Sequence, residues 1–441
     1  MTQDHAARSR RRLTATVTDL EVAVQRAFLI GVELPGMARV DAEHSLAELA
    51  LLTDTAGSDP VDQELVRRTT IDPATYIGSG KADEIRNLTQ ALDIDVVVFD
   101  NPLSPAQTRN LEKIFHCDVV DREALILDIF AQHATTKTGA LQVELAMLRY
   151  NLPRLRGKGK SMSQQGFGVL ARGPGETKLE TDRRHTLQRI SKLERELKAT
   201  AGHRETQRKA RTRNAFPQVA IVGYTNAGKS TLLNALTDAD VKVEDRLFAT
   251  LDSTVRRLEL PDNRTALIAD TVGFVRRLPH HLVEAFQSTL AEVAEADLLL
   301  HLVDGTESDI VGQLAAVREV LVEIGASERP ELLVFNKTDA MEGGTRERLA
   351  NVYPDAVFIS AQKGIGLTDL VDQIAHHLAR QMLTLTIAVP YTRGDVAAAA
   401  HRLGEVRAEK HDEEGTILEV RVPARDRDRF IEFEINGDTK G

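Results

Sequence analysis

The residues with the clearest chemical potential are nine consecutive positions that follow an apolar run. The run, residues 218–222 (QVAIV), is typical of a buried strand, and the residues after it fit the spacing G-x-x-x-x-G-K-S/T. Glycines in such a loop let backbone amides turn inward around phosphate oxygens, and the amino terminus of the following helix adds the positive end of its dipole. The pattern therefore predicts a phosphate-binding loop, which consists of Gly223, Tyr224, Thr225, Asn226, Ala227, Gly228, Lys229, Ser230 and Thr231.

Two side chains of this loop have specific expected roles. Lys229 is expected to bridge the β- and γ-phosphates of a nucleotide, and the Ser230 hydroxyl is expected to ligate Mg²⁺. An earlier glycine–lysine stretch that ends at Lys81 differs. Thr75 stands where the first glycine is needed, and Ala82 replaces the magnesium-binding hydroxyl. We therefore interpret that stretch as a turn that leads into a helix.

An acidic residue follows the next apolar run. Residues 267–270 read as a strand that ends in Asp270, and Thr271, Val272 and Gly273 complete the pattern D-x-x-G. We expect Asp270 to hold Mg²⁺ through a water molecule, and we expect the Gly273 amide to donate to the γ-phosphate.

A third apolar run, residues 332–335, leads into a pattern that resembles the base-reading element N-K-x-D of GTPases. Its members are Asn336, Lys337, Thr338 and Asp339. The Asp339 carboxylate can accept hydrogen bonds from guanine N1 and from its exocyclic amine, whereas adenine presents the wrong donor pattern. A further element resembles the S-A-K type that supports the base, and it reads Ser360, Ala361, Gln362 and Lys363. These elements in this order predict a P-loop GTPase domain that binds GTP and GDP.

Magnesium needs one more hydroxyl, from a loop between the phosphate-binding helix and Asp270. We assign this role to Thr250, because a loop threonine that binds only the triphosphate state is how GTPases sense the γ-phosphate. Thr250 joins Lys229 and Gly273 as an expected catalytic group. Three other threonines are poorer candidates because they fall on expected helices or strands, namely Thr231, Thr254 and Thr265. The neighbours of Thr250 that we expect at the nucleotide are Phe248, Ala249, Leu251 and Asp252.

One expected group is missing from the pattern. Ras-type GTPases place a water-orienting glutamine directly after the D-x-x-G glycine, and here that residue is Phe274. An aromatic ring cannot polarise water, so we expect slow hydrolysis by the protein alone and a partner that organises the attacking water. An alternative stays open, in which another side chain of this protein does so unaided.

The composition bounds the class of protein that must position these residues. With 42% hydrophobic and 28% charged residues over 441 positions, the chain has a globular composition with enough apolar material for packed cores. The single cysteine, Cys117, excludes an internal disulfide and a multi-cysteine zinc site. No apolar run reaches the roughly 18–20 residues of a membrane helix, and the polar, basic start lacks the apolar core of a secretory signal. We expect a cytosolic protein, with peripheral association at a membrane left open.

The apolar pattern divides the chain into five expected segments. Short strands alternate with helices before the phosphate-binding loop, which indicates a parallel sheet with helices packed on it. The expected strands are 27–34, 96–99 and 119–120, and the expected helices are 42–53, 81–92, 104–116 and 121–133. We predict a multidomain α/β protein with a basic amino-terminal arm (1–24), an α/β subdomain (25–136), a helical hairpin (137–213), a GTPase domain with a doubly wound sheet (214–381) and a small α+β domain (382–441). In the last domain we expect strands at 384–390, 416–423 and 430–434 and a helix at 396–407.

The predicted hairpin breaks the charge balance of the chain. Leucines and isoleucine recur at helical spacing in two stripes, Leu141, Leu145 and Leu148 and then Leu187, Ile190, Leu193 and Leu197, with a glycine-rich loop between them. Residues 149–213 hold 18 Lys and Arg but six Asp and Glu, a local net charge of +12 in a chain whose net charge is −10. A solvated charged hairpin is the simpler interpretation. Because the excess charge has one sign and adjoins a glycine-rich loop, a polyanion partner is favoured about as strongly as this simpler interpretation.

With these residues in view, the chain resembles the HflX family of translation-related GTPases over about residues 25–381. The features that carry the resemblance beyond general GTPase elements are 76–81 (YIGSGK), 100–107 (DNPLSPAQ), 142–155 (QVELAMLRYNLPRL) and 172–180 (RGPGETKLE). The loop at 164–171 is bulkier than the nearly pure glycine run that is usual in the family.

The resemblance implies a GTPase that uses Mg²⁺, binds the large ribosomal subunit through its RNA and protein, and dissociates or rescues stalled or idle ribosomes under stress. The ribosome would stimulate hydrolysis. The hairpin loop would contact ribosomal RNA, and the candidate contacts are Arg154, Arg156, Lys158, Lys160, Arg172 and Lys178. We expect a monomer and no DNA partner. Two alternatives stay open: a non-ribosomal GTP switch that regulates a protein, and an RNA-binding or RNA-remodelling protein that also accepts ATP.

Overall fold

The computed structural model describes most of the chain. The described residues are 24–155, 178–213, 216–237, 247–248, 254–261, 264–277, 279, 282–283 and 286–435. Contacts divide the chain into two compact units, residues 1–121 and 122–441. Within the described ranges, no helix is both long enough and apolar enough to cross a membrane.

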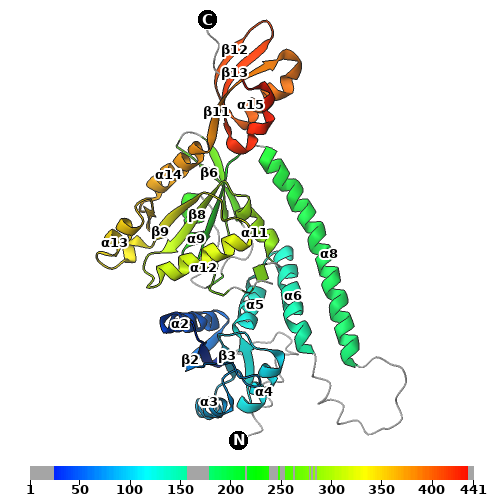
Figure 1. Ribbon diagram of the computed structural model, residues 1–441, viewed down its shortest axis with the longest axis vertical. Helices are drawn as coiled ribbons and strands as arrows, with labels where there is room; N and C mark the ends of the chain where they lie inside the picture. Colours follow the sequence, from blue (N-terminus) through cyan, green and yellow to red (C-terminus); the bar gives the residue numbers. More distant parts are fainter. Residues whose placement is uncertain are drawn as a thin grey trace, which may run out of the picture. The chain divides into compact units, whose positions relative to one another are not determined.

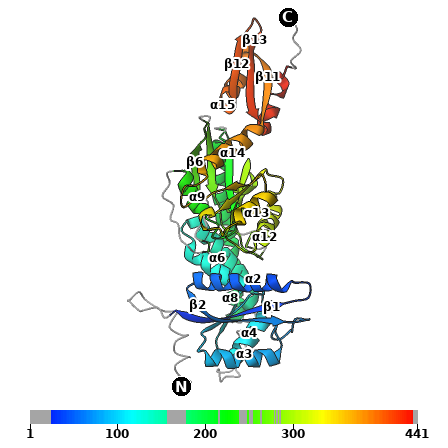
Figure 2. The same ribbon diagram turned by 90° about the vertical axis from the view of Figure 1, so that its left-hand side faces the viewer.

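The first unit is a parallel four-stranded sheet with helices on both faces (Figure 2). Its strands follow the order β2-β1-β3-β4, with bounds β1 (Gln25–Glu33), β2 (Ser58–Arg67), β3 (Val96–Phe99) and β4 (Asp118–Asp121). The helices are α2 (Arg39–Thr55), α3 (Ser79–Ala91) and α4 (Pro105–Phe115). Phe28, Ile30, Val97 and Phe99 from the strands pack with Ile85 of α3 in one buried cluster. The expected α/β architecture of this part is confirmed.

Strand β2 was not predicted from the sequence, because most of its residues are polar and one of them is Pro60. As the edge strand it pairs only with β1, so its outer side needs no apolar face. The register shifts where Pro60 pairs with Ala27 and Asp62 with Phe28, a bulge that accommodates the missing amide hydrogen of proline.

Residues 100–107, which carry part of the family resemblance, shape the loop after β3. The buried Asn101 side chain accepts a hydrogen bond from the Val32 amide at 3.0 Å. Ser104 and Gln107 form a capping box at the start of α4, in which each side chain accepts from the backbone amide of the other. These polar residues therefore fix a loop and a helix start.

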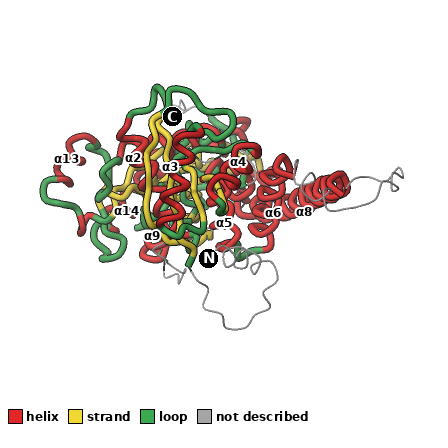
Figure 3. Tube along the Cα trace, turned by 90° about the horizontal axis from the view of Figure 1, so that it is seen from below, coloured by secondary structure: helices red, strands yellow, loops and turns green. Residues whose placement is uncertain are grey.

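The second unit begins with helices. They are α5 (Arg122–His133), α6 (Lys137–Asn151), the short η1 (Leu152–Leu155) and α8 (Lys178–Arg213). The predicted hairpin seam forms where α6 and α8 run side by side, with Leu145, Ile190 and Leu193 buried between them (Figure 3). Leu187 differs from the prediction because it is 42% exposed. The contacts group α5 with the second unit, and the division into five segments stays a prediction.

The central sheet of the second unit has six strands in the order β10-β9-β8-β5-β7-β6 (Figure 1). All neighbours are parallel except β6 and β7, which are antiparallel. The strand bounds are β5 (Gln218–Gly223), β6 (Thr254–Glu259), β7 (Thr265–Asp270), β8 (Leu298–Asp304), β9 (Glu331–Asn336) and β10 (Val357–Phe358). The carboxyl ends of the parallel strands meet at one edge, so the loops that follow them gather there.

Helices cover both faces of this sheet, as expected for a doubly wound domain. The bounds are α9 (Lys229–Leu236), α11 (Gln287–Ala294), α12 (Ile310–Glu323), η3 (Thr338–Ala340), α13 (Thr345–Val352) and α14 (Leu367–Arg380). Leu232 of α9 and Ile374 of α14 pack with Leu300 on one face, whereas Leu314 of α12 packs with Val303 on the other.

The carboxy-terminal domain is a three-stranded antiparallel sheet, β11-β13-β12, with one helix packed on it. The bounds are β11 (Met382–Pro390), η4 (Tyr391–Arg393), α15 (Gly394–Leu403), β12 (Glu405–His411), β13 (Gly415–Pro423), η5 (Ala424–Arg429) and η6 (Ile431–Phe433). The expected helix at 396–407 is wrong at its end. It stops at Leu403, because the Gly404 backbone is extended and leads directly into β12.

The expected strand at 430–434 is also wrong. These residues form 3₁₀ turns, and only Glu434 bridges to β11, at Ile387. The buried Phe430 ring packs into the domain core, which explains the apolar pattern without a strand. The strand β12 was not predicted, because six of its seven residues are exposed and the strand shows no alternation of buried and exposed positions.

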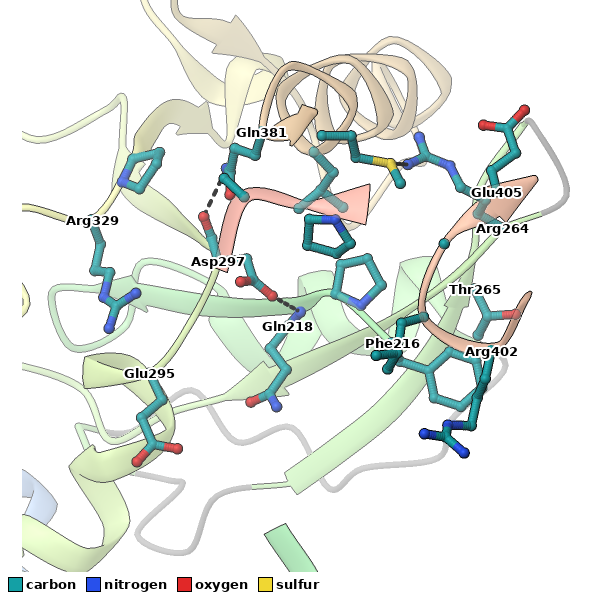
Figure 4. Close-up of a pocket in the computed structure, with 18 residues that line it drawn as sticks. Phe216, Gln218, Arg264, Thr265, Glu295, Asp297, Arg329, Gln381, Arg402 and Glu405 are labelled. Carbon is teal, nitrogen blue, oxygen red and sulfur yellow. Dashed lines mark hydrogen bonds between the residues drawn. The ribbon is translucent and has the colours of Figure 1, made fainter. Parts of the chain in front are cut away.

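A cavity of about 650 Å³ lies between the starts of the central strands and the carboxy-terminal domain (Figure 4). Gln381 donates to the Asp297 carbonyl oxygen at 2.9 Å, and the Asp297 carboxylate accepts from the Gln218 amide at 2.8 Å. Arg421 of β13 donates to the Ala379 carbonyl oxygen at 3.0 Å. This cavity adjoins the strand starts, at the opposite edge of the sheet from the loops that carry the nucleotide motifs.

The Glu331 carboxylate at the start of β9 gives the stability of the fold a pH dependence. His301, fully buried in β8, lies 2.7 Å from the Glu331 carboxylate, which also pairs with Arg318 at 3.1 Å. Burial raises the pKa of Glu331, but hydrogen bonds and charge from His301 and Arg318 outweigh burial and lower that pKa from 4.5 to about 2. Because the pKa of Glu331 is lower in the folded than in the unfolded state, the ionised Glu331 stabilises the fold above pH 4.5. This contribution is lost as the pH falls toward 2.

We predict that Glu331→Gln lowers the thermal unfolding midpoint at pH 7, because a hydrogen-bonded charge is removed at a cost of about 1–3 kcal/mol. The gap to the parent protein should narrow at pH 3, where the parent has lost part of the same contribution. Thermal unfolding at both pH values measures this, with the exposed Glu328→Gln as the matched control. An equal gap at pH 7 and pH 3 would contradict the assignment.

Candidate functional site

The predicted phosphate-binding loop joins the end of β5 to the start of α9. Gly228 is the N-cap of α9 at a φ of +93°, a left-handed conformation that favours glycine. A Cβ at this position would lie 2.4 Å from the Asn336 side-chain nitrogen. The loop therefore needs glycine both for its turn and for its contact with the base-reading segment.

The Lys229 side chain lies folded back over the loop. Its Nζ donates to the carbonyl oxygens of Tyr224 at 2.7 Å and Gly223 at 3.2 Å. Burial lowers the pKa of Lys229 to about 8, and the nearby Asp270 carboxylate opposes that shift. Because both of these acceptors are uncharged carbonyls, an anionic phosphate would add a charged partner for this ammonium.

Ser230 and Asp270 meet where magnesium is expected. The Ser230 hydroxyl donates to Asp270 Oδ2 at 2.6 Å, and Asp270 is fully buried at the end of β7. A hydroxyl and a carboxylate this close are the hard oxygen donors that Mg²⁺ takes, with substrate phosphates and waters completing its shell. The donor set fits Mg²⁺. In the described part of the chain, no cluster of three or more His, Cys, Asp or Glu offers an all-protein metal site.

The D-x-x-G segment is anchored to the phosphate-binding loop. Thr271 donates its hydroxyl hydrogen to the Ile221 carbonyl oxygen at 2.7 Å, and both Thr271 and Val272 are buried. Gly273 approaches the loop so closely that a Cβ would lie 2.7 Å from Thr225 Cγ2 and 3.1 Å from Lys229 Nζ. The Gly273 backbone is thus beside the lysine expected to hold the γ-phosphate.

Phe274, the residue in place of the catalytic glutamine, is a structural link. Its amide donates to the Gly223 carbonyl oxygen at 3.1 Å, and its own carbonyl accepts from the Thr225 amide at 2.8 Å. Its side chain is 1% exposed. A ring buried in this way has no group that could orient water, in agreement with the sequence argument.

The base-reading segments gather around Asn336, which is 3% exposed at the end of β9. Its side-chain nitrogen donates to the Ala227 carbonyl oxygen at 2.8 Å, and its side-chain oxygen accepts from the Ala361 amide at 2.9 Å. The Thr338 amide donates to the Ile359 carbonyl oxygen at 3.1 Å. One buried carboxamide therefore joins three loops that are distant in sequence.

Asp339 is held ready to accept hydrogen bonds from a base. Hydrogen bonds from Ser360 and Lys363 lower the pKa of Asp339, and Lys363 Nζ lies 3.0 Å from its carboxylate. Gln362 follows Ala361 in the same turn and is exposed. The carboxylate stays charged at neutral pH, as an acceptor for two guanine donors must be.

Sequence reasoning missed one residue of this region, Asp304, and one contact, made by the predicted loop residue Tyr224. Asp304 ends β8 and pairs with Lys337 Nζ at 2.6 Å, which fixes the lysine of N-K-x-D. The signal was available, since Asp304 follows an apolar strand just as Asp270 does. The Tyr224 hydroxyl accepts from the Arg276 amide at 2.7 Å, a contact that no spacing rule predicts.

Several predicted site residues lie outside the described part of the chain. They are Ala249, Thr250, Leu251 and Asp252, with Arg156, Lys158, Lys160 and Arg172 of the hairpin loop. Lys178 begins α8, but its side chain is outside the described part too. Phe248 is buried, and the Arg154 guanidinium stacks 3.4 Å from the Tyr150 ring centroid. Thr231 lies on α9, and Thr254 and Thr265 start β6 and β7, as expected for the poorer magnesium candidates.

The earlier lysine, Lys81, has a different environment. Gly78 is the N-cap of α3, and Lys81 on that helix pairs with Glu84 at 3.0 Å and with Glu64. Two carboxylates already neutralise this ammonium, in agreement with a turn that leads into a helix.

Comparisons with known proteins match the chain in three consecutive regions. Residues 43–131 match the family model described as GTP-binding GTPase N-terminal, residues 133–211 match GTP-binding GTPase Middle Region, and residues 218–337 match 50S ribosome-binding GTPase. The GTPase HflX of Caldanaerobacter subterraneus subsp. tengcongensis is 43% identical over 416 residues, 93% of this chain and 94% of that protein. The GTPase HflX of Escherichia coli (strain K12) is 42% identical over 392 residues, 88% and 92% of the two chains. Among solved structures, a GTP-binding protein from Sulfolobus solfataricus in complex with GDP is 26% identical, covers 80% of this chain and 98% of its own, and has a TM-score of 0.41.

We predict that Asp339→Asn transfers the base preference from guanine to xanthine. The amide would present a donor to guanine N1 and its amine, whereas xanthine offers an oxygen in place of that amine. Affinities for GDP and xanthosine diphosphate measure the change, and GDP binding should weaken at least about 100-fold while xanthosine diphosphate binding strengthens. The exposed Asp355→Asn is the matched control. Unchanged GDP affinity in the Asp339 variant would contradict base reading by this carboxylate.

Proposed function

The chain belongs to the family of GTPase HflX proteins and is a GTP-hydrolysing enzyme, and we propose that it acts on the ribosome. In this proposal, the GTP form binds the large ribosomal subunit in the cytosol, as a monomer, and dissociates or rescues stalled or idle ribosomes under stress. Hydrolysis then releases the protein. The observation that carries the proposal is the match of residues 218–337 to the 50S ribosome-binding GTPase family, on a domain whose nucleotide loops are assembled.

The proposed nucleotide chemistry follows from the arrangement of the loops. Lys229 would hold the β- and γ-phosphates, and the Gly273 amide would donate to the γ-phosphate beside it. Ser230, Asp270 and Thr250 are the residues that would hold Mg²⁺, which when bound neutralises charge on the phosphate oxygens. Asp339 would select guanine. Together these groups orient the triphosphate and stabilise the charge that develops on it.

The proposal that the ribosome stimulates hydrolysis is supported by what the described site offers. Phe274 is buried, so its ring does not orient the attacking water. A partner surface that supplies this group would couple hydrolysis to binding, as activating proteins do for other GTPases. The enzyme would then hydrolyse GTP slowly until it reaches its partner.

Contact with ribosomal RNA is proposed for the hairpin because acids of its described part are used internally. Glu144 accepts two hydrogen bonds of 2.7 Å from Arg189, and Glu194 accepts one of 2.8 Å from Arg149. These pairs hold α6 against α8. Glu194 is already counted in the net charge of +12 over 149–213, and Glu144 lies outside that range and offsets one further charge, so a large positive excess remains for a polyanion.

We predict that binding to purified large subunits in the GTP form weakens at least about tenfold between 50 and 200 mM salt, because phosphate contacts release counterions. Co-sedimentation with a non-hydrolysable GTP analogue measures the affinity. Replacing Lys158 and Lys160 together with Ala should reduce the slope of log affinity against log salt concentration by roughly 1–2. The matched control removes Arg407 and Lys410 of β12 in the same way.

A salt-insensitive affinity, or the same slope in both double variants, would remove the hairpin from the RNA contact. No binding to large subunits by the parent protein would favour a GTP switch that regulates another protein.

A further inference from the structure

One threonine of the phosphate-binding loop has a buried hydroxyl with no hydrogen-bond partner among the residues that the structure describes. The Thr225 side chain is 7% exposed, and its Oγ1 is the unpaired atom. The other buried threonines of the described ranges all have hydroxyl partners, and those of Thr237 and Thr271, for example, are carbonyl oxygens at 2.7 Å. Because a buried hydroxyl is costly when unpaired, Thr225 Oγ1 indicates a ligand that completes it.

The unpaired hydroxyl lies beside the two groups expected to hold the γ-phosphate. A Cβ at Gly273 would lie 2.7 Å from Thr225 Cγ2 and 3.1 Å from Lys229 Nζ, so both side chains approach the same point. Oγ1 and Cγ2 are bonded to the same Cβ of Thr225, and the hydroxyl is therefore close to this point as well. A γ-phosphate bound by Lys229 and by the Gly273 amide would have the Thr225 hydroxyl as its neighbour.

Three hydrogen bonds hold the loop around Thr225 against the D-x-x-G segment. The Thr225 amide donates to the Phe274 carbonyl oxygen at 2.8 Å, and the Phe274 amide donates to the Gly223 carbonyl oxygen at 3.1 Å. Between them, the Tyr224 hydroxyl accepts from the Arg276 amide at 2.7 Å. Because the Thr225 backbone is held and a β-branched side chain is stiff at χ1, its hydroxyl loses little conformational entropy when it binds a ligand.

The chemistry of a hydroxyl at this position suits an anionic oxygen. The Thr225 hydroxyl carries one donor hydrogen, and a hydrogen bond to a charged acceptor is shorter and stronger than one to a neutral acceptor. The γ-phosphate of GTP offers such an oxygen, whereas GDP has no γ-phosphate. A hydrogen bond from Thr225 would therefore distinguish the triphosphate from the diphosphate.

We propose that Thr225 is a specificity-determining residue for the triphosphate, and that its hydroxyl donates a hydrogen bond to a γ-phosphate oxygen of GTP. This bond helps to orient the γ-phosphate against Lys229 and Gly273, and it is absent when GDP is bound. The inference deepens the proposed function, because it rests on the proposed binding of the γ-phosphate at Lys229 and Gly273. It gives Thr225 no part in orienting the attacking water.

The test compares Thr225→Val in the full chain with the parent protein, because valine keeps the branched shape and lacks the hydroxyl. We expect binding of a non-hydrolysable GTP analogue, with Mg²⁺ present, to weaken at least about tenfold, the loss typical of a hydrogen bond to a charged group. GDP affinity should stay within about twofold, because GDP lacks the acceptor. For GTP turnover by the protein alone, kcat/KM should fall at least about tenfold.

A second pair of variants keeps the test decisive if Thr225→Val fails to fold. Thr225→Ser and Thr225→Ala both lack the methyl group that faces Gly273, and they differ from each other only in the hydroxyl. The serine variant should bind the analogue at least about tenfold more tightly than the alanine variant, with GDP affinities of the two within about twofold.

The matched control is Thr416→Val, which removes the hydroxyl of a similarly buried threonine in β13 of the carboxy-terminal domain. It lies outside the nucleotide loops, so both affinities and kcat/KM should stay within about twofold of the parent values.

Unchanged analogue affinity in Thr225→Val, an equal loss of analogue and GDP binding, or equal analogue affinities in the serine and alanine variants would overturn the proposal. Lys229→Ala separates this failure from failure of the proposed function. If Lys229→Ala binds the analogue as tightly as the parent does, the assignment of the γ-phosphate to this loop fails, and the role of Thr225 fails with it. If only the Lys229 variant loses analogue binding, the loop assignment stands and the role of Thr225 alone is overturned.

Discussion

The nucleotide site depends on one buried carboxamide. Asn336 donates to the phosphate-binding loop at Ala227 and accepts from the base-supporting turn at Ala361, at 2.8 and 2.9 Å. Gly228 makes room for it, because any side chain there would collide with the amide. The predicted phosphate-binding loop and the predicted base-supporting turn are therefore held to each other through one side chain. Since buried polar groups are costly when unpaired, losing this amide would loosen three loops together.

Lys81 and Lys229 each follow a glycine, but their different surroundings shift their pKa values in opposite directions. Burial lowers the pKa of Lys81, but the hydrogen bonds that its ammonium donates to Glu64 and Glu84, and their charge, outweigh burial and raise that pKa. Lys229 is buried with carbonyl acceptors, and its pKa falls to about 8. The first charge is already neutralised, and the second is available for a phosphate. The sequence distinguishes the two lysines, because only the second has the complete spacing and the hydroxyl after it.

Much of the fold could be predicted because buried strands are apolar. The resemblance to HflX proteins could be predicted because nucleotide-binding motifs require particular residues at fixed spacing. The relatives at 43% and 42% identity confirm the family. The strands β2 and β12 could not be predicted, because polar edge strands lack a periodic signal. The contact of Phe130 with Phe248 joins apolar residues 118 positions apart, and no local pattern specifies it. The magnesium role of Thr250 stays a prediction.

The most direct test of a guanine-specific GTPase activated by the ribosome is GTP turnover with and without purified large ribosomal subunits, with ATP run in parallel. Phe274 leaves the described site without a water-orienting glutamine, and Asp339 is expected to select guanine. The account therefore predicts slow GTP turnover alone, strong stimulation by the subunits and little turnover of ATP. Equal GTP turnover with and without subunits, or comparable turnover of ATP, would contradict it.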